Sequence, residues 1–237
     1  MEIQDKIVLI TGASAGIGLA TARRFAQARA RLALVARSTE QLKQLVDELK
    51  ARGSDAMAIT ADLRDPEQVK HAVAETVHHF RRLDILINNA GQAAIGTVAE
   101  LNPKDFQQIL ELNVFAPLLA MQAAIPVMRT QGGGLIINVS SMVSKMRIPA
   151  LAAYAATKAA LNMLSDTARV ELAAEHIRVI SVFPRLTSTD FAQNSLGNQA
   201  LHQRRRADVN VPVDTPEHVA ERILTAAIDE PDEQYME

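Results

Sequence analysis

The chain has 237 residues, of which 48% are hydrophobic and 22% charged, and its formal net charge is −2. These values are ordinary for a globular domain and exclude a largely disordered or low-complexity chain. The near-neutral charge gives no electrostatic basis for binding nucleic acid or an anionic membrane. Because the sequence has no cysteine, disulfides, thiolate metal sites and a cysteine nucleophile are excluded, and we expect a cytoplasmic location.

Short apolar runs alternate with longer amphipathic segments along the chain. The runs are nearly continuous in hydrophobicity, as strands buried on both faces of a parallel sheet require. They cover residues 7–10, 32–36, 56–60, 85–87, 135–139 and 179–183. Helices are expected over 18–28, 40–50, 66–80, 103–129, 152–174 and 216–229. This alternation predicts one α/β domain over residues 1–237, with a Rossmann-like, doubly wound parallel sheet of about seven strands flanked by helices.

Two segments need separate interpretation. The longest uncharged run, residues 112–128, is shorter than the roughly 20 residues of a membrane helix. It also contains Asn113, so we predict a buried helix in which this asparagine marks a bend or binds water. Residues 184–215 form a long irregular stretch after the sixth strand. Loops there lie at the carboxyl edge of the sheet, and we predict a substrate loop that closes as a lid.

A glycine-rich turn, TGASAGIG at residues 11–18, joins the first strand to a helical pattern. Glycines permit a tight turn, a close approach of the backbone to phosphate, and close packing of helix on strand. The free N–H groups at the start of the following helix suit a pyrophosphate. The turn lacks the Gly-Lys-Ser/Thr ending of a P-loop, so a dinucleotide is favoured over a triphosphate.

The end of the second strand bears on the choice of cofactor. Sites for NAD usually place an acidic residue there to bind the ribose hydroxyl. This sequence has Arg37 and Ser38 instead, which offer a guanidinium and a hydroxyl to a 2′-phosphate. The alternative is an exposed arginine before a helix, but we favour NADP over NAD.

Tyr154 lies four residues before Lys158, so both side chains share one face of the predicted helix. A nearby ammonium favours the phenolate, so we expect Lys158 to lower the pKa of Tyr154 and make it a general acid/base. Ser141 follows the fifth strand and offers a hydroxyl to a substrate carbonyl oxygen. A surface helix pair and a turn cap are the simpler interpretations of these residues.

Together these motifs resemble the short-chain dehydrogenase/reductase family over residues 4–230. The resemblance implies a nicotinamide cofactor and hydride transfer between alcohol and carbonyl groups. It implies four catalytic residues, with Asn113 positioning a water that relays protons to Lys158: Asn113, Ser141, Tyr154 and Lys158. Besides Arg37 and Ser38, the implied cofactor-binding residues are Gly12, Ser14, Gly16, Ile17, Gly18, Asp62, Leu63, Asn89, Ala90, Gly91, Tyr154, Lys158 and Thr189.

The sequence departs from the family pattern at two places. Arg185 replaces the glycine that usually follows the proline after the sixth strand, and it would be strained if that position has a positive φ. The chain also lacks the usual glycine-rich tail, although a short strand around 234–236 is possible. We therefore expect a homodimer or homotetramer paired through the Asn113 and Tyr154 helices, with the tail contact in doubt.

The sequence leaves more than one substrate class and more than one function open. Lys145 and Arg147 either form a basic rim for an acidic carbonyl compound or point to water, and the Arg204–Arg206 cluster fits a solvated helix end. The histidines show no metal-ligand spacing, and His78 and His79 are placed at the amino edge of the sheet, so no metal is expected. The leading hypothesis is an NADP-preferring carbonyl reductase or alcohol dehydrogenase acting on a small molecule. The alternatives are an epimerase or dehydratase of the extended group and a non-catalytic cofactor-sensing regulator.

Overall fold

The computed structural model describes residues 1–198 and 212–236. Seven strands form one parallel sheet in the order β3-β2-β1-β4-β6-β7-β9. Their bounds are β1 Ile7–Thr11, β2 Arg31–Ala36, β3 Ala56–Thr60, β4 Ile85–Asn88, β6 Gly134–Val139, β7 Ile177–Phe183 and β9 Glu233–Tyr235. The order reverses after β3-β2-β1, which makes the sheet doubly wound, as predicted.

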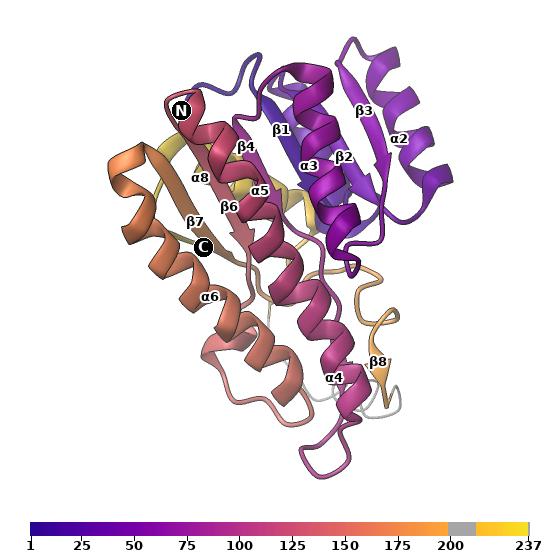
Figure 1. The fold of residues 1–237 in the computed structure, drawn as a ribbon. Coiled ribbons are helices and arrows are strands. Elements are labelled where there is room, and N and C mark those ends of the chain that lie inside the picture. Colours follow the sequence, from indigo (N-terminus) through magenta and orange to yellow (C-terminus); the bar gives the residue numbers. More distant parts are fainter. Residues whose placement is uncertain (199–211, 237) are drawn as a thin grey trace.

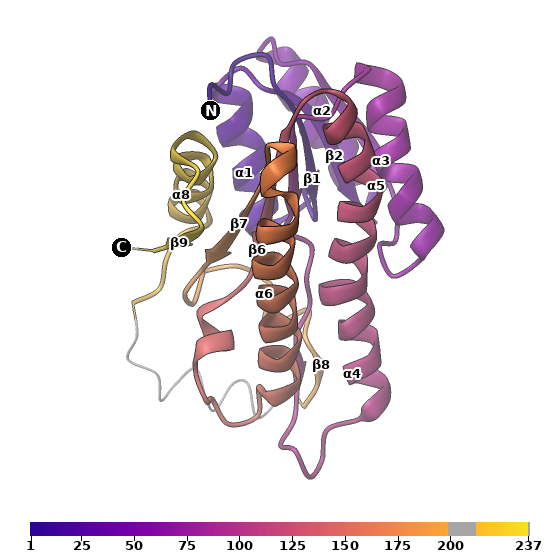
Figure 2. The ribbon, with the colours of Figure 1, turned by 60° about the vertical axis from the view of Figure 1, so that its left-hand side comes forward.

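Helices cover both faces of this sheet. Their bounds are α1 Gly16–Gln27, α2 Thr39–Ala51, α3 Pro66–Phe80, α4 Pro103–Leu110, α5 Ala116–Thr130, α6 Ala152–Leu172 and α8 Pro216–Asp229. Figure 2 shows α1 and α8 on one side of the sheet and α3 and α5 on the other. Alternate residues of β1 serve the two faces: Val8 packs in the α1, α2 and α8 core, and Leu9 packs in the α3 and α5 core. Burial on both faces explains the continuous apolar runs of the strands.

The predicted helix over 103–129 forms with an interruption. Between α4 and α5 the chain adds a π-helix, η1 Glu111–Phe115, and Asn113 lies within it with no exposed surface. A π-helix inserts an extra residue into the helical ladder, so the interruption of the helix falls at this asparagine. The whole segment Pro103–Thr130 is long and apolar enough to cross a membrane. In this fold, however, Ala120, Ala124 and Met128 pack against α3 and the sheet.

Several short elements follow the carboxyl ends of the strands. A 3-10 helix, η2 Met142–Lys145, follows β6; the second 3-10 helix, η3 Ala173–Glu175, ends α6 at the opposite edge of the sheet, just before β7. Two short strands, β5 Ala94–Ile95 and β8 Leu196–Gly197, pair in parallel in a second sheet. In Figure 1, β8 and α4 lie at the end of the molecule toward which the sheet strands point. The elements η2, β5 and β8 thus lie at the edge of the sheet where the site residues were predicted.

Candidate active site at the carboxyl edge

The glycine-rich turn packs directly against the segment that follows β4. A Cβ on Gly12, whose φ is +67°, would lie 2.9 Å from the Cα of Ala90, and one on Gly18 would lie 2.1 Å from the carbonyl oxygen of Gly12. The Thr11 hydroxyl accepts hydrogen bonds from the backbone N–H groups of Asn89 and Ala90 at 2.9 and 3.0 Å. No larger side chain fits at these two glycines, so the close packing of the turn on itself and on the segment after β4 requires glycine at both positions.

The start of α1 is built to receive an anion. Helix α1 begins at Gly16, its N-cap Ala15 makes no side-chain capping bond, and its first turn carries no acidic residue. Its first N–H groups are therefore left for a ligand, and the helix dipole favours negative charge there. Ser14 and Ile17 flank this turn, and a Cβ on Gly16 would lie 3.1 Å from Cγ2 of Thr189. The glycine-rich turn predicted to hold the pyrophosphate thus meets Thr189, another of the predicted cofactor-binding residues, and together they fit a dinucleotide.

The residues predicted for the adenosine end lie at the tips of β2 and β3. Ser38 caps α2 by accepting from the backbone N–H of Gln41, while Arg37 is exposed beside it. Arg64, which the sequence analysis missed, holds Asp62 through its Nε at 3.1 Å from Oδ1. That hydrogen bond chiefly lowers the pKa of Asp62, and the charge of Arg37 adds to the effect. Leu63 is buried, whereas Arg37 is exposed.

Asn113 is committed to protein groups. Its Oδ1 accepts from the backbone N–H of Gln92 at 2.9 Å, and its Nδ2 donates to the Gln92 carbonyl at 2.8 Å and to the Thr157 hydroxyl at 3.0 Å. The side chain therefore ties the segment after β4 to α6. These side-chain contacts show no water-positioning role for Asn113, so that role stays an implication of the family resemblance.

Helix α6 brings Tyr154 and Lys158 to the end of β6. Tyr154 hydrogen-bonds Ser141, the N-cap of η2. Lys158 is 3% exposed, and its Nζ donates to the carbonyl of Val139 at 2.8 Å and lies 6.0 Å from the Tyr154 ring centroid. A Cβ on Gly91 would lie 3.6 Å from the same Nζ, so this glycine leaves room beside the lysine. The predicted set Ser141, Tyr154 and Lys158 therefore converges at one point.

Lys158 was expected to lower the pKa of Tyr154, but burial has the larger effect on this pKa. Burial raises the pKa of Tyr154 to about 12, against a smaller lowering by the hydrogen bond with Ser141. Burial also lowers the pKa of Lys158 to about 8. For both groups, desolvation shifts the pKa more than their mutual interaction does, because the ammonium contacts a carbonyl rather than the phenol. At neutral pH Tyr154 is accordingly a protonated donor.

The substrate loop is docked in its described part. The ring of Phe191 lies 5.6 Å from that of Tyr154, and Nε2 of Gln92 donates to the carbonyl of Asn194 at 2.6 Å. Beyond them β8 pairs with β5, where a Cβ on Gly197 would lie 2.3 Å from the carbonyl oxygen of Ile95. Residues 199–211, which include Arg204–Arg206, lie outside the described residues.

Two basic side chains differ from expectation. Arg185 is not among the described residues with positive φ, so it replaces the family's glycine without strain, and it pairs with Asp214. Lys145 is paired within the fold: its Nζ donates to the Glu233 carboxylate of β9 at 2.9 Å and lies 4.2 Å from the Phe183 ring centroid. Because Lys145 is ion-paired with Glu233, it does not supply a free positive charge to the basic rim suggested for the pocket.

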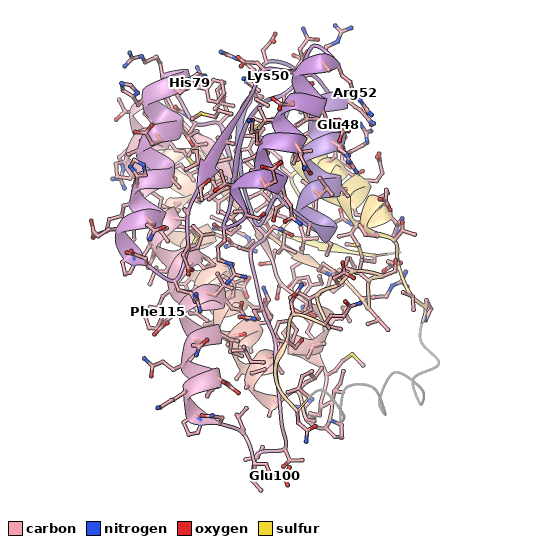
Figure 3. All side chains as sticks on the ribbon, turned by 90° about the vertical axis from the view of Figure 1, so that its right-hand side faces the viewer. Glu48, Lys50, Arg52, His79, Glu100 and Phe115 are labelled. Atoms are coloured by element: carbon pink, nitrogen blue, oxygen red, sulfur yellow. The ribbon has the colours of Figure 1, made fainter. Side chains whose placement is uncertain are left out.

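The histidine pair lies away from this site. Figure 3 places His79 with Lys50 and Arg52 at one end of the molecule and Glu100 at the other. His78 and His79 stand in the last turn of α3, at the amino edge of the sheet as predicted. Within residues 1–198 and 212–236, no group of three or more histidine, aspartate or glutamate side chains could hold a metal ion.

The fold and these contacts define a dinucleotide-binding α/β enzyme with a tyrosine and a lysine at the carboxyl edge of its sheet. Residues 6–200 match the family model for short chain dehydrogenases. The chain belongs to the short-chain dehydrogenase/reductase family. It is therefore an NAD(P)-dependent oxidoreductase that acts on alcohol or carbonyl groups.

Individual relatives are similar over most of the chain. An uncharacterized oxidoreductase of Thermotoga maritima is 36% identical over 236 residues, covering 97% of this chain and 93% of that protein. A 3alpha-hydroxysteroid dehydrogenase of Mediterraneibacter gnavus is 36% identical over 192 residues, covering 80% of this chain and 77% of its own. The structure of L-sorbose reductase from Gluconobacter frateurii with NADPH and L-sorbose has a TM-score of 0.85 at 31% identity, covering 95% of this chain and 91% of its own.

A fourth relative carries the other cofactor. A short-chain dehydrogenase/reductase from Burkholderia phymatum in complex with NAD has a TM-score of 0.90 at 25% identity, covering 100% of this chain and 89% of its own. One structural relative thus binds NAD and another NADPH. The comparisons define the cofactor class and leave the preference to this chain's own residues.

Proposed function

We propose that the protein is an NADPH-preferring reductase of a neutral, largely apolar carbonyl compound, with Tyr154 as the proton donor. The observation that carries this proposal is the convergence of Ser141, Tyr154 and Lys158 beside the glycine-rich turn. The bound cofactor supplies hydride to the carbonyl carbon. The filled catalytic positions favour this function over a non-catalytic regulator.

The protein groups act on the carbonyl oxygen and its proton. Ser141 and Tyr154 lie within hydrogen-bonding reach of each other, so a carbonyl oxygen that replaces this bond can accept from both hydroxyls. Negative charge develops on that oxygen as the carbonyl is reduced, and Tyr154 gives it a proton. Lys158 stands behind the tyrosine with room beside Gly91, where it would hold the cofactor's ribose. Burial keeps water from competing for these hydrogen bonds.

The preference for NADPH rests on Arg37. It is exposed at the tip of β2, and none of the ion pairs within the described chain engages it. Arg64 beside it is already bound to Asp62, and no acidic residue stands at positions 37 or 38 to bind a ribose hydroxyl. A free guanidinium in this place suits a 2′-phosphate.

The substrate class follows from the walls of the site. The Phe191 ring lies 5.6 Å from that of Tyr154, and Ile95, Val143, Ile148 and Leu151 form an apolar group that joins β5, η2 and the start of α6. Lys145 is neutralised by Glu233, so it offers no charge to a substrate acid. An apolar carbonyl compound therefore suits the site better than an acidic one.

We also propose a homodimer paired through α5 and α6. Large apolar side chains are exposed on α6 and just before α5: Met163 is 67% exposed and Val170 79%, and Phe115, the N-cap of α5, is 52% exposed. Figure 3 shows Phe115 at the outer edge of the molecule. Light scattering should give a dimer mass for the wild type and a monomer mass for Met163→Asp, whereas a monomeric wild type would reject the proposal.

The cofactor preference is tested by thermal shift with NADPH and with NADH. A ligand that binds only the folded state stabilises it by about 2.7 kcal/mol at a hundredfold excess over Kd. NADPH should stabilise the wild type more than NADH, and Arg37→Ala should abolish the difference. Arg52→Ala, an exposed arginine at the far end of α2, is the matched control and should leave it unchanged. Equal or stronger stabilisation of the wild type by NADH would reject the NADPH preference.

A further inference from the structure

The face of α6 that carries Tyr154 and Lys158 continues one turn further, to Asn162. The three residues are spaced by four, so they stack along one side of the helix. Tyr154 and Lys158 contact Ser141 and Val139, whereas Asn162 contacts the serines before and after Ser141. Asn162 itself belongs to neither the catalytic set nor the cofactor site described above.

The hydrogen bonds around Asn162 have only one arrangement. The Ser144 hydroxyl donates its single hydrogen to the carbonyl oxygen of Ser141 at 2.7 Å. It must therefore accept from Nδ2 of Asn162, at 2.9 Å. Oδ1 of Asn162 is left to accept from the Ser140 hydroxyl. Turning the amide over would take the Ser144 hydrogen away from Ser141, so the chain of bonds fixes both the amide and the serines.

The segment that carries Ser141 is tied to β7 as well as to α6. The backbone N–H groups of Ser140 and Met142 donate to carbonyls of Val182 and Pro184, at 2.8 and 3.0 Å. Those bonds tie the segment to β7 and the residue that follows it. The four-residue η2 also packs against α6. The Asn162 amide hydrogen-bonds Ser140 before this turn and Ser144 within it, and so links the turn to the helix that carries Tyr154.

We propose that Asn162 is a positioning residue that sets the place of the Ser141 hydroxyl relative to Tyr154. The proposal rests on the proposed function, because the two hydroxyls act there on one carbonyl oxygen. A small displacement of a reacting group can cost about 100-fold in rate. Asn162 thus acts on the reaction through Ser141 while making no contact with the cofactor-binding turn.

The test uses Asn162→Asp, which keeps the size of the side chain and removes its donor. The hydroxyl of Ser144 must then donate to the new carboxylate, so it releases the carbonyl of Ser141. Ser165→Ala is the matched control, because Ser165 accepts from Asn138 at 2.8 Å one turn further along α6 and has no bond to the Ser141 segment. Each variant changes one polar side chain on the face of α6 that meets β6 or the segment after it.

Two measurements are made on the full chain. Hydrogen exchange by mass spectrometry should show faster exchange over residues 140–146 in Asn162→Asp and no change there in Ser165→Ala. Steady-state kinetics with NADPH and phenanthrenequinone, a neutral apolar diketone, should show kcat reduced roughly 10- to 100-fold in Asn162→Asp. The KM for NADPH should stay unchanged, and Ser165→Ala should keep the wild-type kcat.

A double-mutant cycle with Ser144→Ala completes the design. Residues in one hydrogen-bond chain show non-additive effects, so the double variant should lose little more than Asn162→Asp alone. Unchanged exchange over 140–146, or a kcat that follows the Ser165→Ala control, would overturn the proposal. If the wild type reduces no carbonyl probe, the proposed function fails instead, and the exchange result still decides the role of Asn162.

Discussion

Arg185 binds Asp214 through two parallel hydrogen bonds, from Nε to Oδ2 at 3.0 Å and from Nη2 to Oδ1 at 2.8 Å. Arg185 follows β7 and Asp214 precedes α8, so the pair joins the two described ends of the substrate loop. The backbone of Asp214 also bonds to Leu186 and Ser188. The arginine that replaces the family's glycine therefore anchors the loop beside the site.

Asp214→Asn tests this anchor. The Asp214 side chain is only 7% exposed, so loss of its charge leaves the guanidinium without its buried partner. We expect a lower Tm and a several-fold higher KM for the carbonyl substrate, with the Kd for NADPH unchanged. Glu217→Gln, which changes an exposed carboxylate nearby, is the control. Equal behaviour of the two variants would show that the ion pair does not hold the loop.

Gly18→Ala should abolish cofactor binding. Its Cβ would lie 2.1 Å from the carbonyl oxygen of Gly12, so the glycine-rich turn must open. Gly132→Ala is the control, because its φ of +86° strains an alanine while nothing lies within 4 Å. Titration with NADPH should find no binding in the first variant, and a stability loss of about 1 kcal/mol with intact binding in the second. Binding by Gly18→Ala would contradict the assignment of the turn.

Lys158 makes stability depend on pH. Burial lowers its pKa to about 8, below its value in an unfolded chain, so between these values the unfolded state binds more protons. Its contribution to the free energy of unfolding is therefore greatest above the unfolded pKa and falls as the pH drops through about 8. Urea unfolding should show the wild type gaining about 2–3 kcal/mol relative to Lys158→Met between pH 7 and pH 10. A pH-independent difference would mean that the lysine is not desolvated.

Phe191 is expected to select the substrate. Its ring lies over Tyr154, so Phe191→Ala should lower kcat/KM for phenanthrenequinone about tenfold and leave the Kd for NADPH unchanged. Phe191→Leu keeps an apolar cover and should lose less. A variant that prefers charged carbonyl compounds would support the proposed wall, whereas unchanged specificity in Phe191→Ala would count against it.

The strands and most helices were predictable because their signals are local. The apolar runs gave β1 to β4, β6 and β7 within a few residues, and the final strand forms at Glu233–Tyr235, one residue before the expected place. The convergence of Ser141, Tyr154 and Lys158 was also accessible, since each follows a strand end or a helical spacing.

The remaining features depend on tertiary contacts. The pairing of β5 with β8 joins residues about a hundred positions apart, and neither two-residue strand carries a pattern. The partners of Asn113 and Lys145 come from distant segments, Gln92 and Glu233, so spacing could not reveal them. The ion pair between Arg64 and Asp62 was only weakly indicated, by the spacing of two residues between them. The pKa of Tyr154 was misjudged because burial, which a sequence shows poorly, outweighs the nearby ammonium.

The most direct test of the account compares Tyr154→Phe with the wild type in NADPH-linked carbonyl reduction. The account predicts an unchanged Kd for NADPH and a kcat lower by roughly 10²- to 10³-fold, because the proton donor is gone while the cofactor site is intact. Tyr235→Phe, which changes the only other tyrosine, should keep its activity. Turnover close to the wild type in Tyr154→Phe would contradict the central role of this tyrosine.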